Sequence, residues 1–141
     1  MNHEFFEKAL AQVKKQWPDA RPRYGLICGS GWSDVAGAFE TLGSLDYAAI
    51  PGLGATGVAG HAGKLVRARI LGKELLVFQG RRHFYEGEGW TPVALPIYLL
   101  KKLGAAALVL TNAAGGVRKD LKPGDLMLIE DHINLFGTNP L

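Results

Sequence analysis

The sequence predicts an α/β fold, a single domain in which helices flank a central twisted mixed sheet. Apolar residues recur at helical spacing in one segment, capping residues bracket a second helix, and short apolar runs of the kind that form strands lie between and after these helices. One such run, residues 106–111, is apolar up to its last residue, which is typical of a strand covered on both faces. The 141 residues are enough for one domain with one sizeable core.

The first elements follow from spacing and from turn residues. Apolar residues recur every three or four positions over residues 3–17, with charges between them and a proline after them, which predicts an amphipathic helix. A strand over residues 24–28 stops at the turn Gly29-Ser30-Gly31. A helix over residues 32–39 is expected to leave that turn.

Two apolar runs over residues 65–70 and 74–79 flank the turn Leu71-Gly72-Lys73 and predict a hairpin. Apolar and basic residues alternate in its first strand, so one face of the hairpin is basic. Residues 64–82 hold six basic residues and one acidic residue. A local positive field of this kind suits an anionic ligand.

Capping residues bracket a helix over residues 92–103. Thr91 is a good N-cap, Pro92 suits the first helical position, and Gly104 suits the position after the last turn. Pro96 lies in the first turns, so we expect a bend rather than a break.

The strand over residues 106–111 ends in the loop Asn112-Ala113-Ala114-Gly115-Gly116, and residues 124–133 predict a further strand. Loops at the carboxyl ends of strands are where ligands collect in α/β sheets. The turn at Ser30 and the segment 80–83 also follow predicted strands, so three loops of this kind are expected to meet.

These loops together describe an oxyanion pocket. Small residues let backbone N–H groups converge, while Ser30 adds a hydroxyl, Arg81 a fork of donors and His83 a further donor. Each feature also has a plain structural interpretation. The Gly-Ser-Gly turn lacks the third glycine of a dinucleotide site and the lysine of a P-loop, and Arg81 with Arg82 could be a solvated end of the hairpin.

Composition excludes several classes of protein. Hydrophobic residues make up 48% and charged residues 21%, which excludes a disordered chain. No apolar run approaches the roughly 20 residues of a membrane span, and the first residues lack the pattern of a secretory signal. Cys28 is the only cysteine, so no intrachain disulfide is possible, and we expect a cytoplasmic protein without membrane contact.

Metal binding and cysteine chemistry are not expected. His61, His83 and His132 lack the spacing of a preformed metal site. Cys28 is expected to be buried at a strand end, because nothing in the sequence supplies a base partner for a nucleophile.

Five blocks occur in order along the chain: Cys28-Gly29-Ser30-Gly31, Gly60-His61-Ala62-Gly63-Lys64-Leu65, Gly80-Arg81-Arg82-His83-Phe84-Tyr85-Glu86-Gly87, Thr111-Asn112-Ala113-Ala114-Gly115-Gly116 and Asp131-His132-Ile133-Asn134-Leu135. With this order and spacing they closely resemble the trimeric purine nucleoside phosphorylase family, over residues 24–141. The resemblance implies phosphorolysis, in which inorganic phosphate cleaves the glycosidic bond of a purine ribonucleoside or deoxyribonucleoside. It implies no metal or organic cofactor, purine nucleoside and phosphate as partners, and a homotrimer for the full-length protein.

The resemblance also implies roles for individual residues. Phosphate would be held by Ser30, His61, Arg81, His83 and the backbone N–H of Ala113. The nucleoside would contact Tyr85, Ala114 and Gly115. His83 and Glu86 would form the catalytic pair, with Glu86 orienting the imidazole. Arg82 departs from the smaller or apolar residue usual in the family and receives no role.

Family members are considerably longer, so we expect the 141 residues to be the N-terminal portion of an incomplete phosphorylase domain, without the residues that recognise the purine. The block Tyr85-Glu86-Gly87 favours a nucleoside with a free 5′-hydroxyl over methylthioadenosine. Alternatives are xanthosine or methylthioadenosine specificity, and a noncatalytic module that binds phosphate or nucleoside. Nucleic-acid binding through residues 64–82 is a weaker alternative, because the net charge is only +3.

Overall fold

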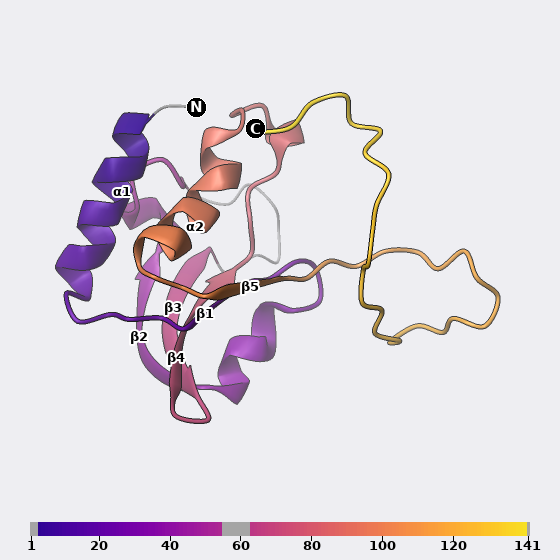
Figure 1. The fold of residues 1–141 in the computed structure, drawn as a ribbon, viewed down its shortest axis with the longest axis horizontal. Helices are drawn as coiled ribbons and strands as arrows, with labels where there is room; N and C mark the ends of the chain where they lie inside the picture. Colours follow the sequence, from indigo (N-terminus) through magenta and orange to yellow (C-terminus); the bar gives the residue numbers. More distant parts are fainter. Residues whose placement is uncertain (1–2, 55–62, 141) are drawn as a thin grey trace.

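The computed structural model describes residues 3–54 and 63–140, and it confirms the α/β class. Five strands form one mixed sheet in the order β2-β3-β4-β1-β5 (Figure 1). The elements are α1 (His3–Gln16), β1 (Tyr24–Ile27), η1 (Ser33–Ala38), β2 (Glu40–Asp46), η2 (Tyr47–Ala49), β3 (Lys64–Ile70), β4 (Lys73–Gln79), η3 (Phe84–Glu86), α2 (Thr91–Lys102) and β5 (Ala107–Leu110).

The sheet lies between two apolar layers. Its strands alternate between faces, so that Leu76 and Phe78 of β4 join the cluster under α1 and α2, whereas Leu75 and Val77 face η1. Figure 1 shows both long helices on the same side of the sheet. Because both faces of the central strands are covered, the runs predicted for them are continuously apolar.

Topology determines where the loops meet. Strands β4, β1 and β5 are parallel neighbours, with β1 in the middle. Their carboxyl ends therefore lie at one edge of the sheet, and the segments after residues 27, 79 and 110 leave from that edge. The antiparallel strands β2 and β3 extend the sheet on the other side.

The predicted hairpin is confirmed as β3 and β4, with a tighter turn than expected. Ile70 pairs with Lys73, so only two residues form the loop. Leu71 and Gly72 both have positive φ, 48° and 72°, as a type I′ turn requires. On the predicted basic face of the hairpin, Arg67 pairs with Asp19 and Glu74.

Arg69 is paired as well, with Glu40 of β2. Arg82 is paired too, with Glu86 and Glu88, so three of the six basic residues of segment 64–82 are neutralised by carboxylates. This pairing weakens the case for a nucleic-acid surface on the hairpin, since such a surface needs unpaired cations.

The two helical predictions at the ends of the core hold with small changes. The first helix ends at Gln16, and α2 continues through Pro96 without a break. Trp90, not Thr91, occupies the N-cap position of α2. Gly104 follows the helix with φ +87°, as expected for the residue that ends it.

Other elements differ from the prediction in length, existence or burial. The helix expected over residues 32–39 is a short 3-10 helix over residues 33–38, and the strand β2 that follows it was not predicted. β5 pairs only with β1 among the described strands, and Val109 and Leu110 are 55% and 59% exposed, so the strand is not covered on both faces.

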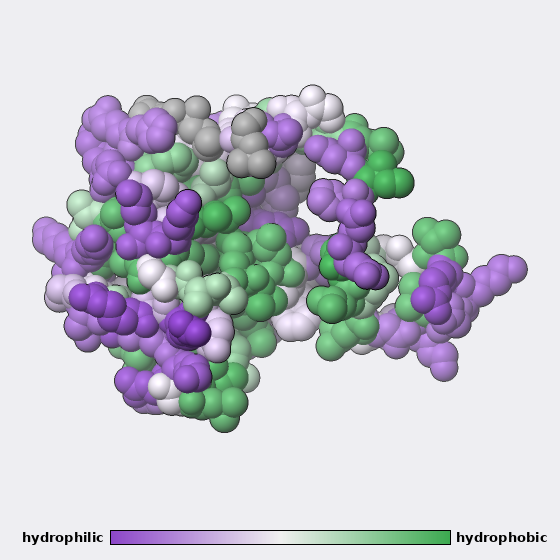
Figure 2. Space-filling model, in the orientation of Figure 1, coloured by the Kyte–Doolittle hydropathy of each residue, from purple (hydrophilic) through white to green (hydrophobic). Residues whose placement is uncertain are grey.

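Residues 124–133 form no strand, which corrects that prediction. A strand needs a neighbour for its backbone groups, and no described segment pairs with these residues. The segment from residue 111 onward leaves the sheet and forms a wide excursion (Figure 1). Its apolar side chains, such as Leu126 and Leu128, are exposed. Figure 2 shows separate hydrophobic areas on the excursion, beyond the packed body.

No helix in the described part of the chain is both long enough and apolar enough to cross a membrane.

Candidate active site

The loops after β1, β4 and β5 are joined through Thr111. The backbone N–H of Gly29 donates to Thr111 Oγ1 at 2.9 Å, and Arg81 Nη1 donates to the Thr111 carbonyl at 2.6 Å. Thr111 itself is buried. One residue at the end of β5 therefore holds the other two loops against it, and the structure brings together three predicted segments that are far apart in sequence.

Gly29 is required at this junction. A Cβ at that position would lie 2.3 Å from the Thr111 carbonyl oxygen, closer than any real contact. Cys28, just before it, is fully buried, and burial raises the pKa of its thiol. The thiol is therefore a packing group, as the sequence predicted.

His83 and Glu86 form the pair expected of them. Oε1 of Glu86 accepts from the backbone N–H of His83 at 2.7 Å and lies 3.1 Å from Nδ1 of the same residue. Burial acts to raise the pKa of Glu86, but the hydrogen bonds from His83 and the charge of Arg82 outweigh it and lower that pKa below its usual range. The carboxylate is ionised at neutral pH and can only accept.

An accepting carboxylate determines the tautomer of the imidazole. Nδ1 of His83 must carry a proton to bond Glu86. Nε2 is then the acceptor nitrogen, and Nε of Arg81 donates to it at 3.5 Å. In the neutral ring Nε2 accepts a hydrogen bond, and in the imidazolium it donates one. The pair can therefore form a hydrogen bond with either a protonated or an unprotonated oxygen of phosphate.

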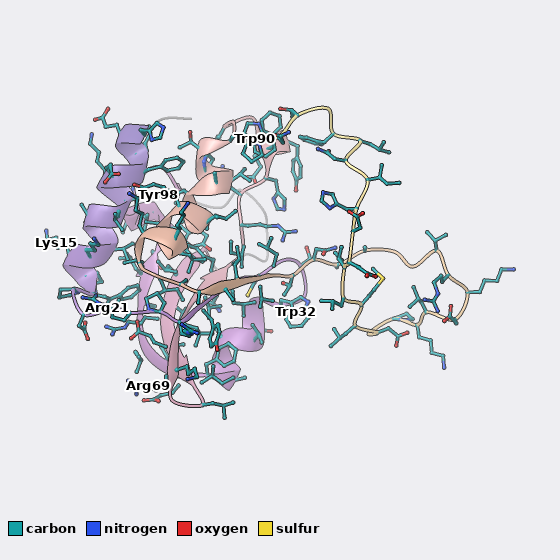
Figure 3. All side chains as sticks on the ribbon, viewed as in Figure 1. Lys15, Arg21, Trp32, Arg69, Trp90 and Tyr98 are labelled. Carbon is teal, nitrogen blue, oxygen red and sulfur yellow. The ribbon has the colours of Figure 1, made fainter. Side chains whose placement is uncertain are left out.

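Aromatic rings flank this pair. The ring of Tyr85 stacks on that of His83, with centroids 4.9 Å apart, and Tyr85 is largely exposed. Phe84 packs on Trp90 and on Phe136 from the C-terminal segment. Figure 3 shows Trp90 near the point where that segment returns to the body.

The remaining predicted residues are placed less fully. Ser30 lies on the exposed turn after β1, and Ala113, Ala114 and Gly115 are exposed on the loop after β5. They belong to loops that Thr111 holds together, but their side chains make no contact that assigns a ligand. His61 lies outside the described residues.

Two residues of the site were not assigned from sequence. Thr111 ends a predicted strand and begins one of the five blocks, but it received no role, because that role depends on both of its oxygens meeting loops from other strands. Arg82 stands in the phosphate motif yet is buried. The signals that could have suggested Thr111 are its place at the end of an apolar run and at the start of the fourth block.

No group of three or more metal-ligating side chains occurs within residues 3–54 and 63–140. A hollow of about 450 Å³ lies away from the three loops, at the carboxyl ends of α1 and α2, and is lined by Lys14, Arg21 and Lys102 among others. We place the candidate site at the three loops rather than there, because Arg21 already donates to the carbonyls of residues 18 and 20, and lysines in last turns compensate helix dipoles.

Comparison with known proteins gives consistent results. The family model described as "Phosphorylase superfamily" matches residues 23–141. Purine nucleoside phosphorylase 1 of Bacillus subtilis is 46% identical over 135 residues, which cover 96% of this chain and 49% of that protein.

Two solved structures agree with the fold. A purine nucleoside phosphorylase in complex with ribose 1-phosphate superposes with a TM-score of 0.76 at 39% identity, covering 88% of this chain and 45% of the other. A schistosoma purine nucleoside phosphorylase in complex with hypoxanthine gives 0.75 at 37% identity, with 88% and 43% covered. The chain thus spans about half the length of the relatives it matches. These matches show that the chain belongs to the phosphorylase superfamily, with purine nucleoside phosphorylases as its relatives over these residues.

Proposed function

We propose that the chain supplies the phosphate-binding and part of the ribose-binding site of a purine nucleoside phosphorylase. The observation that carries the proposal is the meeting of three loops at the carboxyl ends of β1, β4 and β5, with Arg81 and the His83–Glu86 pair beside Thr111. A relative solved with ribose 1-phosphate supports it, since that compound is a product of phosphorolysis.

The reaction places demands that these residues can meet. An oxygen of phosphate forms a bond to the anomeric carbon while the bond from that carbon to the purine nitrogen breaks, and the base leaves with the electron pair. The sugar gains oxocarbenium character in the transition state. A phosphate dianion held by Arg81, His83, Ser30 and the N–H of Ala113 stabilises that charge and then captures the carbon.

The exposed ring of Tyr85, stacked on His83, is suited to pack against the ribose. The small residues Ala114 and Gly115 are suited to lie against a flat base. The donors and acceptors that recognise the purine are not assigned to any described residue, so we expect little turnover from this chain alone. No metal or organic cofactor is proposed, and inorganic phosphate is the co-substrate.

The likeness of the motifs to trimeric family members supports a homotrimer for the whole protein. The single buried cysteine agrees with a reducing compartment, which supports a cytoplasmic location.

The first test is binding of inorganic phosphate by calorimetry, with phosphate-dependent release of hypoxanthine from inosine measured on the same sample. Arg81→Met is expected to weaken phosphate binding roughly 10- to 100-fold, the value of one or two charge-assisted hydrogen bonds. Arg69→Met is the matched control, because Arg69 lies on β3 and pairs with Glu40 of β2. Figure 3 shows Arg69 at the bottom of the view and Trp90, which packs on η3, at the top.

Equal effects of the two substitutions would remove Arg81 from the site. Phosphate binding without hypoxanthine release would favour the alternative of a noncatalytic phosphate-binding module. Release of hypoxanthine by this chain would overturn our expectation that turnover needs further residues.

A further inference from the structure

Arg82 lies between two proposed phosphate ligands but belongs to a different surface. It is only 5% exposed, whereas Arg81 and His83 on either side are partly accessible. The backbone at His83 is extended, with φ −121° and ψ 147°, and successive side chains of an extended backbone point in opposite directions. Arg82 is therefore directed inward, away from the proposed phosphate.

Three separate segments meet the Arg82 guanidinium. Its Nε lies 2.8 Å from Oε2 of Glu86, its Nη2 donates to Glu88, and its Nη1 donates to the Leu53 carbonyl at 3.4 Å. Room for the group is tight, since a Cβ on Gly54 would lie 3.2 Å from Nη1. One buried cation thus connects the end of the segment after η2 with the 3-10 helix η3 and the turn that follows it.

The two oxygens of Glu86 are divided between neighbours. Oε1 meets the backbone and ring of His83, and Oε2 meets Arg82. Glu86 is itself mostly buried, with 12% of its side chain exposed. A buried carboxylate that loses a partner must take up a proton or turn toward water. Either change weakens the charge-assisted bond to Nδ1 of His83.

We infer that Arg82 is a positioning residue, which holds the carboxylate of Glu86 against the imidazole of His83 and so fixes the ring that faces phosphate. This inference rests on the proposed function only for the identity of the ligand. The contact among Arg82, Glu86 and His83 can be tested without any ligand.

The test is proton and nitrogen NMR of the imidazole Nδ1–H of His83 in the folded chain, followed by titration with inorganic phosphate. Wild type is expected to show a slowly exchanging downfield Nδ1–H signal. Arg82→Met is expected to lose that signal or move it upfield and to bind phosphate about tenfold more weakly. Arg82→Lys should restore part of both, because the ammonium keeps the charge but not the fork of donors.

The matched control is Arg69→Met, which removes an arginine from a surface ion pair with Glu40 and should leave both readouts unchanged. If Arg82→Met does not fold, Glu88→Gln provides the test, since Glu88 is half exposed and its loss should shift the signal in the same direction by a smaller amount. An unchanged His83 signal in folded Arg82→Met, or in Glu88→Gln where that variant stands in for it, would overturn the inference.

Failure of the proposed function gives a different pattern. In that case wild type shows the Nδ1–H signal and its dependence on Arg82, but inorganic phosphate produces no saturable change. A wild-type chain without the signal would instead overturn the inference, whatever its affinity for phosphate.

Discussion

At the scale of single residues, the contact between Gly29 and Thr111 is the most restrictive in the candidate site. We predict that Gly29→Ala destabilises the chain by about 2–4 kcal/mol, because the new methyl group would have to displace backbone and break a buried hydrogen bond. Urea unfolding followed by circular dichroism measures this loss. Phosphate affinity should fall with it, since the same displacement separates the loops.

Gly37→Ala is the matched control for that substitution. An added Cβ at position 37 would meet open space, and Gly37 is not one of the glycines with a positive φ. Its free energy of unfolding should change by less than about 0.5 kcal/mol. An equal loss of unfolding free energy in both variants would mean that the contact with Thr111 is not the cause, and would refute the specific role of Gly29.

The Glu86 carboxylate should make the site sensitive to acid. Its pKa in the folded chain lies below the ordinary value, because the hydrogen bonds from His83 and the charge of Arg82 outweigh the opposing effect of burial. A carboxyl group with a lowered folded pKa stabilises the fold above its unfolded pKa, about 4.3, and this contribution is lost as pH falls through the folded pKa.

We therefore predict that Glu86→Gln costs about 1–3 kcal/mol of unfolding free energy at pH 7 and progressively less below about pH 4. Urea titrations of both proteins at several pH values measure the difference directly. Other acidic groups with lowered pKa, such as Asp19, are present in both proteins and cancel. A difference that does not change with pH would show that Glu86 acts without its charge.

At the scale of elements, the hairpin turn contains a residue poorly suited to its backbone. Leu71 has φ 48° and a side chain that is almost fully exposed, so it carries the cost of a left-handed conformation without packing in return. Asparagine tolerates this conformation and is preferred before glycine in type I′ turns. We predict that Leu71→Asn raises the free energy of unfolding by about 0.5–1 kcal/mol.

Leu71→Ala is the control for that prediction. It also removes the exposed leucine side chain, but alanine does not relieve the positive φ. Thermal unfolding should therefore show a gain for asparagine and none for alanine. Equal gains would attribute the effect to loss of the exposed apolar group instead of to the turn.

Elements whose contacts are local could be predicted from sequence, and elements defined by distant partners could not. The helix over His3–Gln16 and the hairpin of β3 and β4 follow from periodicity and turn residues alone. The strand expected over residues 124–133 has the right composition, but no described segment pairs with it. β2 was missed because its residues are mostly polar or half exposed, which gives no apolar pattern to detect.

The site divides in the same way. His83 and Glu86 are three residues apart, and their contact could be expected from the motif. Thr111 meets Gly29 across 82 positions and Arg81 across 30. Those contacts depend on the order of β4, β1 and β5 in the sheet, and this order cannot be deduced from a single sequence.

At the scale of the whole molecule, the described surface is unusual in its apolar exposure. Val109 and Leu110 are more than half exposed on β5, whose outer edge is unpaired in the described chain. Exposed apolar residues continue along the C-terminal segment, as Figure 2 shows; they include Val117, Leu126, Met127, Leu128, Ile133 and Leu135. A strand edge without a partner is a template for pairing with another chain, and exposed apolar side chains beside it favour such an association.

We therefore predict that the purified chain self-associates, with an average mass in sedimentation velocity that rises with concentration. Val109→Lys should reduce that association by tenfold or more, because a charged side chain on an edge strand opposes pairing. Leu71→Lys is the matched control: it also exchanges an exposed apolar side chain for a lysine, but at the hairpin turn, so association should persist. A wild-type chain that stays monomeric at every concentration would contradict the prediction. Equal relief by both substitutions would mean that net charge, not the β5 edge, controls association.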